Sequence, residues 1–139
     1  MIVPLMNRRA INPVADACPC GLPAAYDACC GRFHSGPLHL LALDPQALMR
    51  SRYSAFVKDV RAYLLDTWHP STRPPVIEAP EPGLIWLGLD VKRAPLASEG
   101  EGLVEFVARS KLGGRAQRLH EVSLFVREEG RWFYLRAQL

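Results

Sequence analysis

The chain has 139 residues and 49% of them are hydrophobic, which is enough for one core domain and a small appendage. The formal net charge is only +3 at pH 7, so the charge does not favour a nucleic-acid partner. No apolar stretch is long enough to span a membrane, and the apolar run in residues 1–6 is too short for the core of an export signal. We therefore expect a cytoplasmic protein with no membrane association.

The first part of the chain divides into a tail and a segment rich in cysteine. Residues 1–16 have no hydrophobic period and contain Pro4 and Pro13, so we predict a flexible tail there. Residues 17–36 then contain every cysteine of the chain within thirteen positions, and turn-forming proline and glycine residues surround them. The four cysteines are Cys18, Cys20, Cys29 and Cys30.

Four thiols at this spacing are the ligand set of a structural zinc ion. Four thiolates complete a tetrahedral zinc site and leave no open position for a substrate. We therefore predict one structural zinc ion bound by the four cysteines. The alternative is a pair of disulfides in an oxidising compartment. Two of the three pairings would staple a hairpin, whereas bonds from Cys18 to Cys20 and from Cys29 to Cys30 would close very small rings. We expect Tyr26 to pack over this zinc knuckle and His34 to lie on the surface.

Residues 40–139 form the predicted main domain, and its first half is helical. Asp44 is a suitable N-cap and Pro45 suits the first helical position. Apolar residues then recur at helical spacing at Leu48, Met49, Tyr53, Phe56 and Val57. A second helix is predicted for residues 60–68, before Pro70, and a proline-rich extended loop for residues 70–83.

The second half of the main domain has the alternating pattern of β-strands. Ile85, Leu87, Leu89 and Val91 alternate with other residues in the first predicted strand. Further strands are predicted for residues 104–109, 119–127 and 131–136, with a turn at residues 128–130 between the last two. Helices followed by antiparallel strands indicate an α+β domain, in which the helices pack on one face of a curved antiparallel sheet.

These segments resemble two known sequence patterns. The cysteine segment resembles the SEC-C motif, a Cys-x-Cys-x8-Cys-(Cys/His) zinc knuckle. Residues 48–56 (LMRSRYSAF) and 67–73 (TWHPSTR) resemble the YchJ-like bacterial family, as do residues 104–106, 119–121 and 130–132. The resemblance runs from residue 18 to 135. It implies a nuclear transport factor 2-like cone of curved sheet behind the zinc knuckle. It does not imply a function, because this fold includes enzymes as well as pure binding modules.

Four ionisable residues are candidates for a ligand pocket in the cone: His69, Arg73, Glu105 and Glu121. They lie near the expected ends of helices or strands, and the planar guanidinium of Arg73 suits a carboxylate or phosphate. Each residue also has a structural interpretation. His69 can serve as a helix-terminal contact, and a buried carboxylate can pair with Arg50 or Arg52 and simply stabilise the fold.

The sequence therefore supports two functional hypotheses. The first is a zinc-binding, non-catalytic interaction protein that binds another protein through the knuckle. The alternative is a small-molecule enzyme or ligand-binding protein that uses the cone pocket for a small, partly anionic ligand. An exposed apolar patch beside the knuckle would favour the first hypothesis, and a deep pocket with close polar side chains would favour the second.

Overall fold

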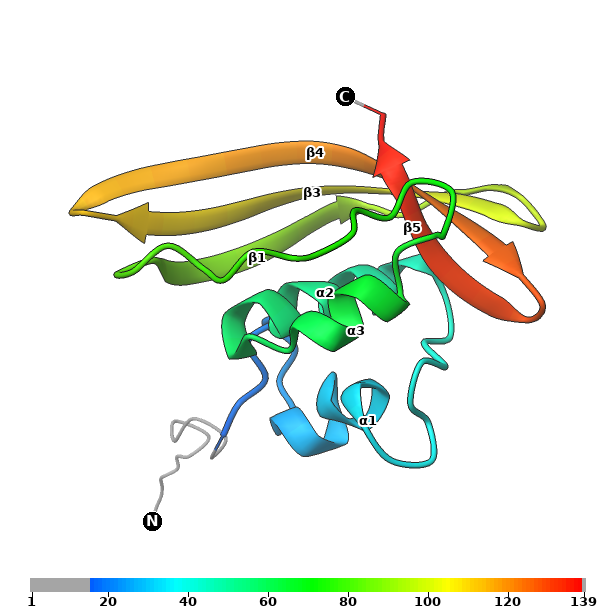
Figure 1. Ribbon diagram of the computed structural model, residues 1–139, viewed down its shortest axis with the longest axis horizontal. Coiled ribbons are helices and arrows are strands. Elements are labelled where there is room, and N and C mark those ends of the chain that lie inside the picture. The colour runs from blue at the N-terminus through cyan, green and yellow to red at the C-terminus, as the bar shows by residue number, and fades with distance from the viewer. Residues whose placement is uncertain (1–15, 139) are drawn as a thin grey trace, which may run out of the picture.

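Two helices lie across one face of a curved antiparallel sheet in the computed structural model, which describes residues 16–138. The helices are α2 (Pro45–Lys58) and α3 (Arg61–Asp66). The cysteine segment contains a short 3₁₀ helix, η1 (Tyr26–Ala28), and α1 (Gly31–His34). Figure 1 shows α1 on the side of α2 and α3 that faces away from the sheet. The tail predicted for residues 1–16 lies outside the described residues except for Asp16.

Helix α2 begins and ends as the sequence predicts. The Oδ1 atom of Asp44 accepts a hydrogen bond of 2.7 Å from the backbone N–H of Ala47, and Pro45 occupies the first turn. The helix ends at Asp59, which adopts the left-handed conformation. Helix α3 is shorter than the predicted range of 60–68. Trp68 lies beyond its end and forms an isolated bridge with Tyr134 of the sheet.

The sheet has the strand order β1-β3-β4-β5, and the short strand β2 also pairs with β3. The strands are β1 (Ile85–Arg93), β2 (Leu96–Ser98), β3 (Glu101–Leu112), β4 (Arg115–Glu128) and β5 (Arg131–Ala137). All the pairings between these strands are antiparallel, as predicted. Strand β2 was not predicted, since three residues are too few to show a period.

One irregularity in β1 changes the predicted alternation. The register shifts between Trp86 and Gly88, which places one extra residue, Leu87, in a bulge. Trp86, Leu89 and Val91 consequently pack against the core. Ile85 and Leu87 are instead more than half exposed, so the apolar side chains of β1 do not share one face.

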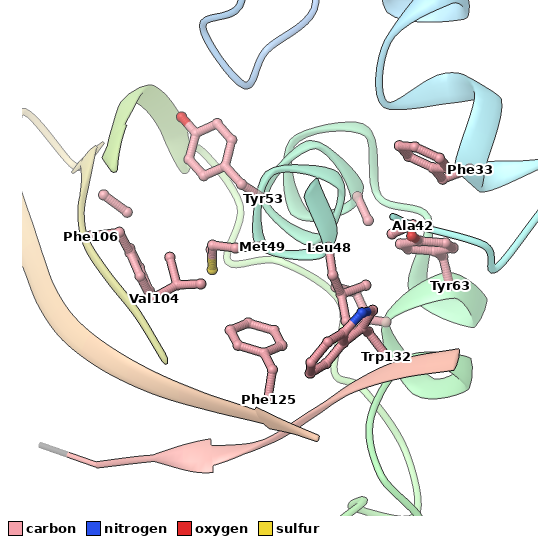
Figure 2. Packing of buried hydrophobic residues seen from close by; sticks show 13 residues of the cluster. Phe33, Ala42, Leu48, Met49, Tyr53, Tyr63, Val104, Phe106, Phe125 and Trp132 are labelled. Atoms are coloured by element: carbon pink, nitrogen blue, oxygen red, sulfur yellow. The ribbon is translucent and has the colours of Figure 1, made fainter. Parts of the chain in front are cut away.

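The core fills the space between the helices and the sheet. Figure 2 shows Leu48 and Met49 of α2 directed toward Phe125 and Val104 of the sheet. Phe33, from the end of the cysteine segment, belongs to the same cluster of buried residues. The core therefore continues past the helices into the region of the four cysteines. Within residues 16–138, no helix combines the length and the apolar character needed to cross a membrane.

Candidate metal centre and the cavity beside the sheet

The backbone of residues 16–30 folds into a loop that brings the two cysteine pairs together. A bridge joins Ala17 to Ala25, and the N–H of Cys18 donates a hydrogen bond of 2.9 Å to the carbonyl of Ala24. Gly21 has a φ of +94°, a conformation that glycine adopts without strain and that allows the turn after Cys20. The second pair, Cys29 and Cys30, follows η1 and leads into α1.

The four sulfur atoms form a compact and buried group. All four lie within 4.8 Å of one another, and each cysteine is buried. The Sγ atoms of Cys20 and Cys29 are 3.7 Å apart. A tetrahedral zinc ion with bonds of about 2.3 Å separates its sulfur ligands by about 3.8 Å, whereas a disulfide bond is about 2.0 Å long. The four cysteines are free thiols, and their arrangement fits one tetrahedral metal ion.

The thiols influence one another's ionisation strongly. A hydrogen bond from the Cys30 thiol lowers the pKa of Cys20 to about 5. Burial raises the pKa of Cys29 to about 11, and the hydrogen bond to Cys20 raises the pKa of Cys30. Cys20 therefore ionises readily, whereas Cys29 and Cys30 resist ionisation. A bound divalent cation supplies the positive charge that allows all four to become thiolates.

Helix α2 holds the cysteine loop from one side. The Oγ atom of Ser54 lies 3.4 Å from the Sγ atom of Cys18. The Nη1 atom of Arg50 donates a hydrogen bond of 2.8 Å to the backbone carbonyl of Cys20. Two of the four candidate ligands are thus positioned by side chains of the main domain.

His34 forms a second connection between the knuckle and α2. Its Nε2 atom lies 2.8 Å from the carbonyl of Ser51, so Nε2 carries the proton, and Nδ1 accepts a hydrogen bond of 2.5 Å from the hydroxyl of Tyr26. Burial lowers the pKa of His34, which favours this neutral form. The expectation of a surface histidine is therefore wrong. Tyr26 packs against the four cysteines, which confirms its predicted place.

The four residues proposed for the cone pocket do not converge. His69 Nε2 lies 2.8 Å from a carboxylate oxygen of Glu128, and Arg73 Nε donates to the carbonyl of Trp68. Glu105 accepts hydrogen bonds of 2.7 Å from Arg93 and from His120. The expectation of a common pocket for His69, Arg73, Glu105 and Glu121 is therefore wrong.

The reason for this error lies in the register of β3 and β4. Glu105 pairs with Val122, while Phe106 pairs with Glu121. Side chains of successive residues point to opposite faces of a sheet, so the two carboxylates lie on opposite faces. Glu121 is the one member of the predicted set that faces the helices and lines a cavity there.

This cavity lies between α2 and the sheet and has a volume of about 290 Å³. Half of the twelve residues that line it are aromatic, and three others, Arg52, Glu121 and Ser123, are polar or charged. The aromatic residues are Tyr53, Phe56, Trp68, Trp86, Phe106 and Tyr134. Glu121 Oε2 accepts a hydrogen bond of 2.5 Å from the hydroxyl of Ser123, and the hydroxyl of Tyr134 lies 3.4 Å from the same oxygen.

Arg52 lines the cavity, whereas the sequence suggested for it only a structural role as an ion-pair partner. It is only 4% exposed, and its Nη1 atom donates hydrogen bonds to the carbonyl of Leu64 and the hydroxyl of Thr67. Burial lowers the pKa of Arg52 to about 10, so it remains charged at neutral pH. The sequence indicated that Arg52 faces the core, because Arg52 lies four residues from Leu48 and from Phe56, on the apolar face of α2.

Residues 44–137 match the family model described as the middle NTF2-like domain of YchJ. The chain belongs to the YchJ-like family. Among its relatives, a UPF0225 protein of Methylibium petroleiphilum is 62% identical over 122 residues, which cover 88% of each chain. A UPF0225 protein of Bordetella bronchiseptica is 56% identical over 130 residues, which cover 94% of this chain and 96% of the relative.

Two solved structures of SEC-C motif containing proteins share the fold of this YchJ-like chain. The protein from Rhodopseudomonas palustris superimposes with a TM-score of 0.76 at 33% identity, over 87% of this chain and 96% of that chain. The protein from Psychrobacter arcticus gives a TM-score of 0.72 at 29% identity, over 88% of this chain and 81% of that chain. These matches confirm the predicted combination of a SEC-C motif with a nuclear transport factor 2-like domain.

Proposed function

We propose that this protein is a zinc-binding, non-catalytic interaction protein that binds another protein through its knuckle. The convergence of four buried cysteine sulfurs beside α2 carries this proposal. Four thiolates at tetrahedral spacing are typical of structural zinc, and such a site has no open position for a substrate. The role of the metal is then to hold the loop of residues 17–34 against Arg50 and Ser54.

The segment that follows the knuckle exposes three leucines, and these support binding of a protein. Within residues 38–43, Leu40 packs against the core and Ala42 is buried, so this segment is attached to the rest of the protein. The three other leucines of the segment, Leu38, Leu41 and Leu43, are exposed, and Leu43 is 74% exposed. Three exposed leucines within six residues of anchored backbone suit the binding of another protein. A reducing compartment such as the cytoplasm would keep the cysteines available for zinc.

Site-specific photo-crosslinking in cells tests the proposed surface. The photoreactive residue p-benzoylphenylalanine replaces Leu43 in one variant and Ile85 in a control. Ile85 is similarly apolar and exposed (56%), but it pairs with Lys111, at the opposite end of β3 from Gly102 and Pro45. We expect the Leu43 position to give a defined cross-linked protein that the Ile85 position does not give. The Cys20→Ser substitution should abolish this cross-link. Equal cross-linking at both positions, or none at Leu43, would contradict binding through this surface.

The cavity favours a second candidate function, the binding of a small molecule between α2 and the sheet. Its volume of about 290 Å³ lies near the lower end of the range for ligand pockets, roughly 300–1,000 Å³. Apolar and aromatic walls with a few polar groups are typical of such pockets. Arg52 and Glu121 provide these polar groups here.

A further inference from the structure

We infer that the cavity binds a small, uncharged molecule with an apolar body and a carboxamide group, whose oxygen accepts from Arg52 and whose N–H donates to Glu121. This inference rests on the second candidate function and specifies its ligand. It follows from the charges at the end of the cavity, from the hydrogen-bonding capacity that these groups retain, and from the aromatic wall.

The charges in the cavity wall are balanced. Arg52 is positive and Glu121 is negative, and no ion pair joins them among the described residues. Both approach Tyr134: the guanidinium lies over its ring, 4.7 Å from the centroid, and the carboxylate lies beside its hydroxyl. A charged ligand of either sign is attracted by one of these residues and repelled by the other, so the two contacts offset each other. Burying its charge still costs free energy, which a neutral ligand does not lose. The cavity therefore favours a neutral polar group.

The two charged residues each retain hydrogen-bonding capacity. Among residues 16–138, the hydrogen bonds of the Arg52 guanidinium all come from Nη1, while Nε and Nη2 have no acceptor. Likewise, Glu121 accepts at Oε2, and Oε1 has no donor within the same residues. A guanidinium has five N–H donors and a carboxylate two acceptor oxygens. A carboxamide combines one acceptor oxygen with an N–H₂ donor and complements both groups.

The remaining wall selects an apolar body. Trp86 packs against Tyr53, with ring centroids 5.5 Å apart, and against Phe56, with centroids 6.0 Å apart. Phe56 and Leu119 are also 40% and 50% exposed, so they form the solvent-facing part of the cavity wall. An aromatic ring placed there gains the burial and edge-to-face contacts that aromatic pairs favour. The polar end of the ligand then reaches Arg52 and Glu121.

Three probes with one body and different polar groups test this inference: 3-phenylpropanamide, 3-phenylpropanoate and 3-phenylpropylamine. Binding is followed by ¹H–¹⁵N NMR of the three tryptophan indoles. Trp68 and Trp86 line the cavity, whereas Trp132 does not and serves as an internal control. We expect the amide to shift the signals of Trp68 and Trp86 but not of Trp132. We also expect it to bind about tenfold more tightly than either charged probe, which corresponds to a cost of about 1.4 kcal/mol for burying the charge of the probe.

The Glu121→Gln substitution provides a second test that does not depend on removing the buried arginine. Without the carboxylate, Arg52 is the only charge in the cavity wall, so 3-phenylpropanoate should become the tightest of the three probes. The NMR spectrum of the variant also shows whether it is folded.

The possible failures are distinguishable. If no probe shifts Trp68 or Trp86 at millimolar concentration, small-molecule binding in the cavity is itself contradicted. If probes bind but a charged probe binds the wild-type protein as tightly as the amide, the cavity binds ligands and the carboxamide assignment is wrong. If Glu121→Gln leaves the order of the probes unchanged, the role given to Glu121 is wrong.

Discussion

Replacement of Cys20 by serine is expected to release the metal and to unfold the knuckle while the sheet stays folded. Cys20 is fully buried among the other three cysteines, and the knuckle contains few apolar residues of its own. Without the metal, the hydrogen bonds that Arg50, Ser54 and His34 make between the knuckle and α2 are lost as well. At about 1 kcal/mol each, these contacts amount to about 3 kcal/mol, which corresponds to a fall in Tm of roughly 10 °C.

Hydrogen exchange by mass spectrometry locates this effect along the chain. We expect residues 17–34 of the Cys20→Ser variant to lose protection, while β3 and β4 keep theirs. Removing the metal from the wild-type protein with a chelator should give the same pattern. Asp27→Ser is the matched control, because Asp27 is exposed within the same loop and is not a candidate ligand. Loss of the cooperative unfolding transition of the whole Cys20→Ser protein would contradict a knuckle that is separable from the main fold.

Replacement of Phe125 by alanine is expected to lower the free energy of unfolding by about 3–5 kcal/mol. The Phe125 side chain is fully buried between the sheet and α2, where Figure 2 shows it beside Met49 and Trp132. Its removal leaves a cavity that the packed neighbours cannot fill. A loss of this size is a large part of the roughly 5–15 kcal/mol that stabilises a typical domain. Urea denaturation of both proteins measures the difference.

Leu96→Ala is the matched control for this substitution. Leu96 is also a large apolar residue in the sheet, but its side chain is 63% exposed. We expect its replacement to change the free energy of unfolding by no more than about 0.5 kcal/mol. A change of less than 1 kcal/mol for Phe125→Ala would mean that this ring does not belong to the core described above.

The features that the sequence predicted correctly depend on residues close together in the chain. The N-cap at Asp44 and the apolar period that follows it are local, and they place the start of α2 correctly. The four cysteines occupy thirteen residues, so their spacing alone restricts them to one small site. The alternation of Val104, Phe106 and Ala108 in β3 is also a local pattern, and all three residues lie in the core.

The features that sequence reasoning missed depend on how distant segments pair. The bulge at Leu87 belongs to the pairing of β1 with β3, and a single strand does not reveal it. The opposite orientations of Glu105 and Glu121 follow from the register between β3 and β4. His34 appeared to be a surface residue because its partner, the carbonyl of Ser51, lies 17 positions away.

The central claim is that Cys18, Cys20, Cys29 and Cys30 bind one zinc ion. Elemental analysis of the purified wild-type protein, combined with a titration of its thiols, tests it most directly. We expect about one zinc per chain, and four thiols that react only after a chelator removes the metal. A protein without zinc whose four thiols react freely, or one that contains disulfides, would contradict the claim.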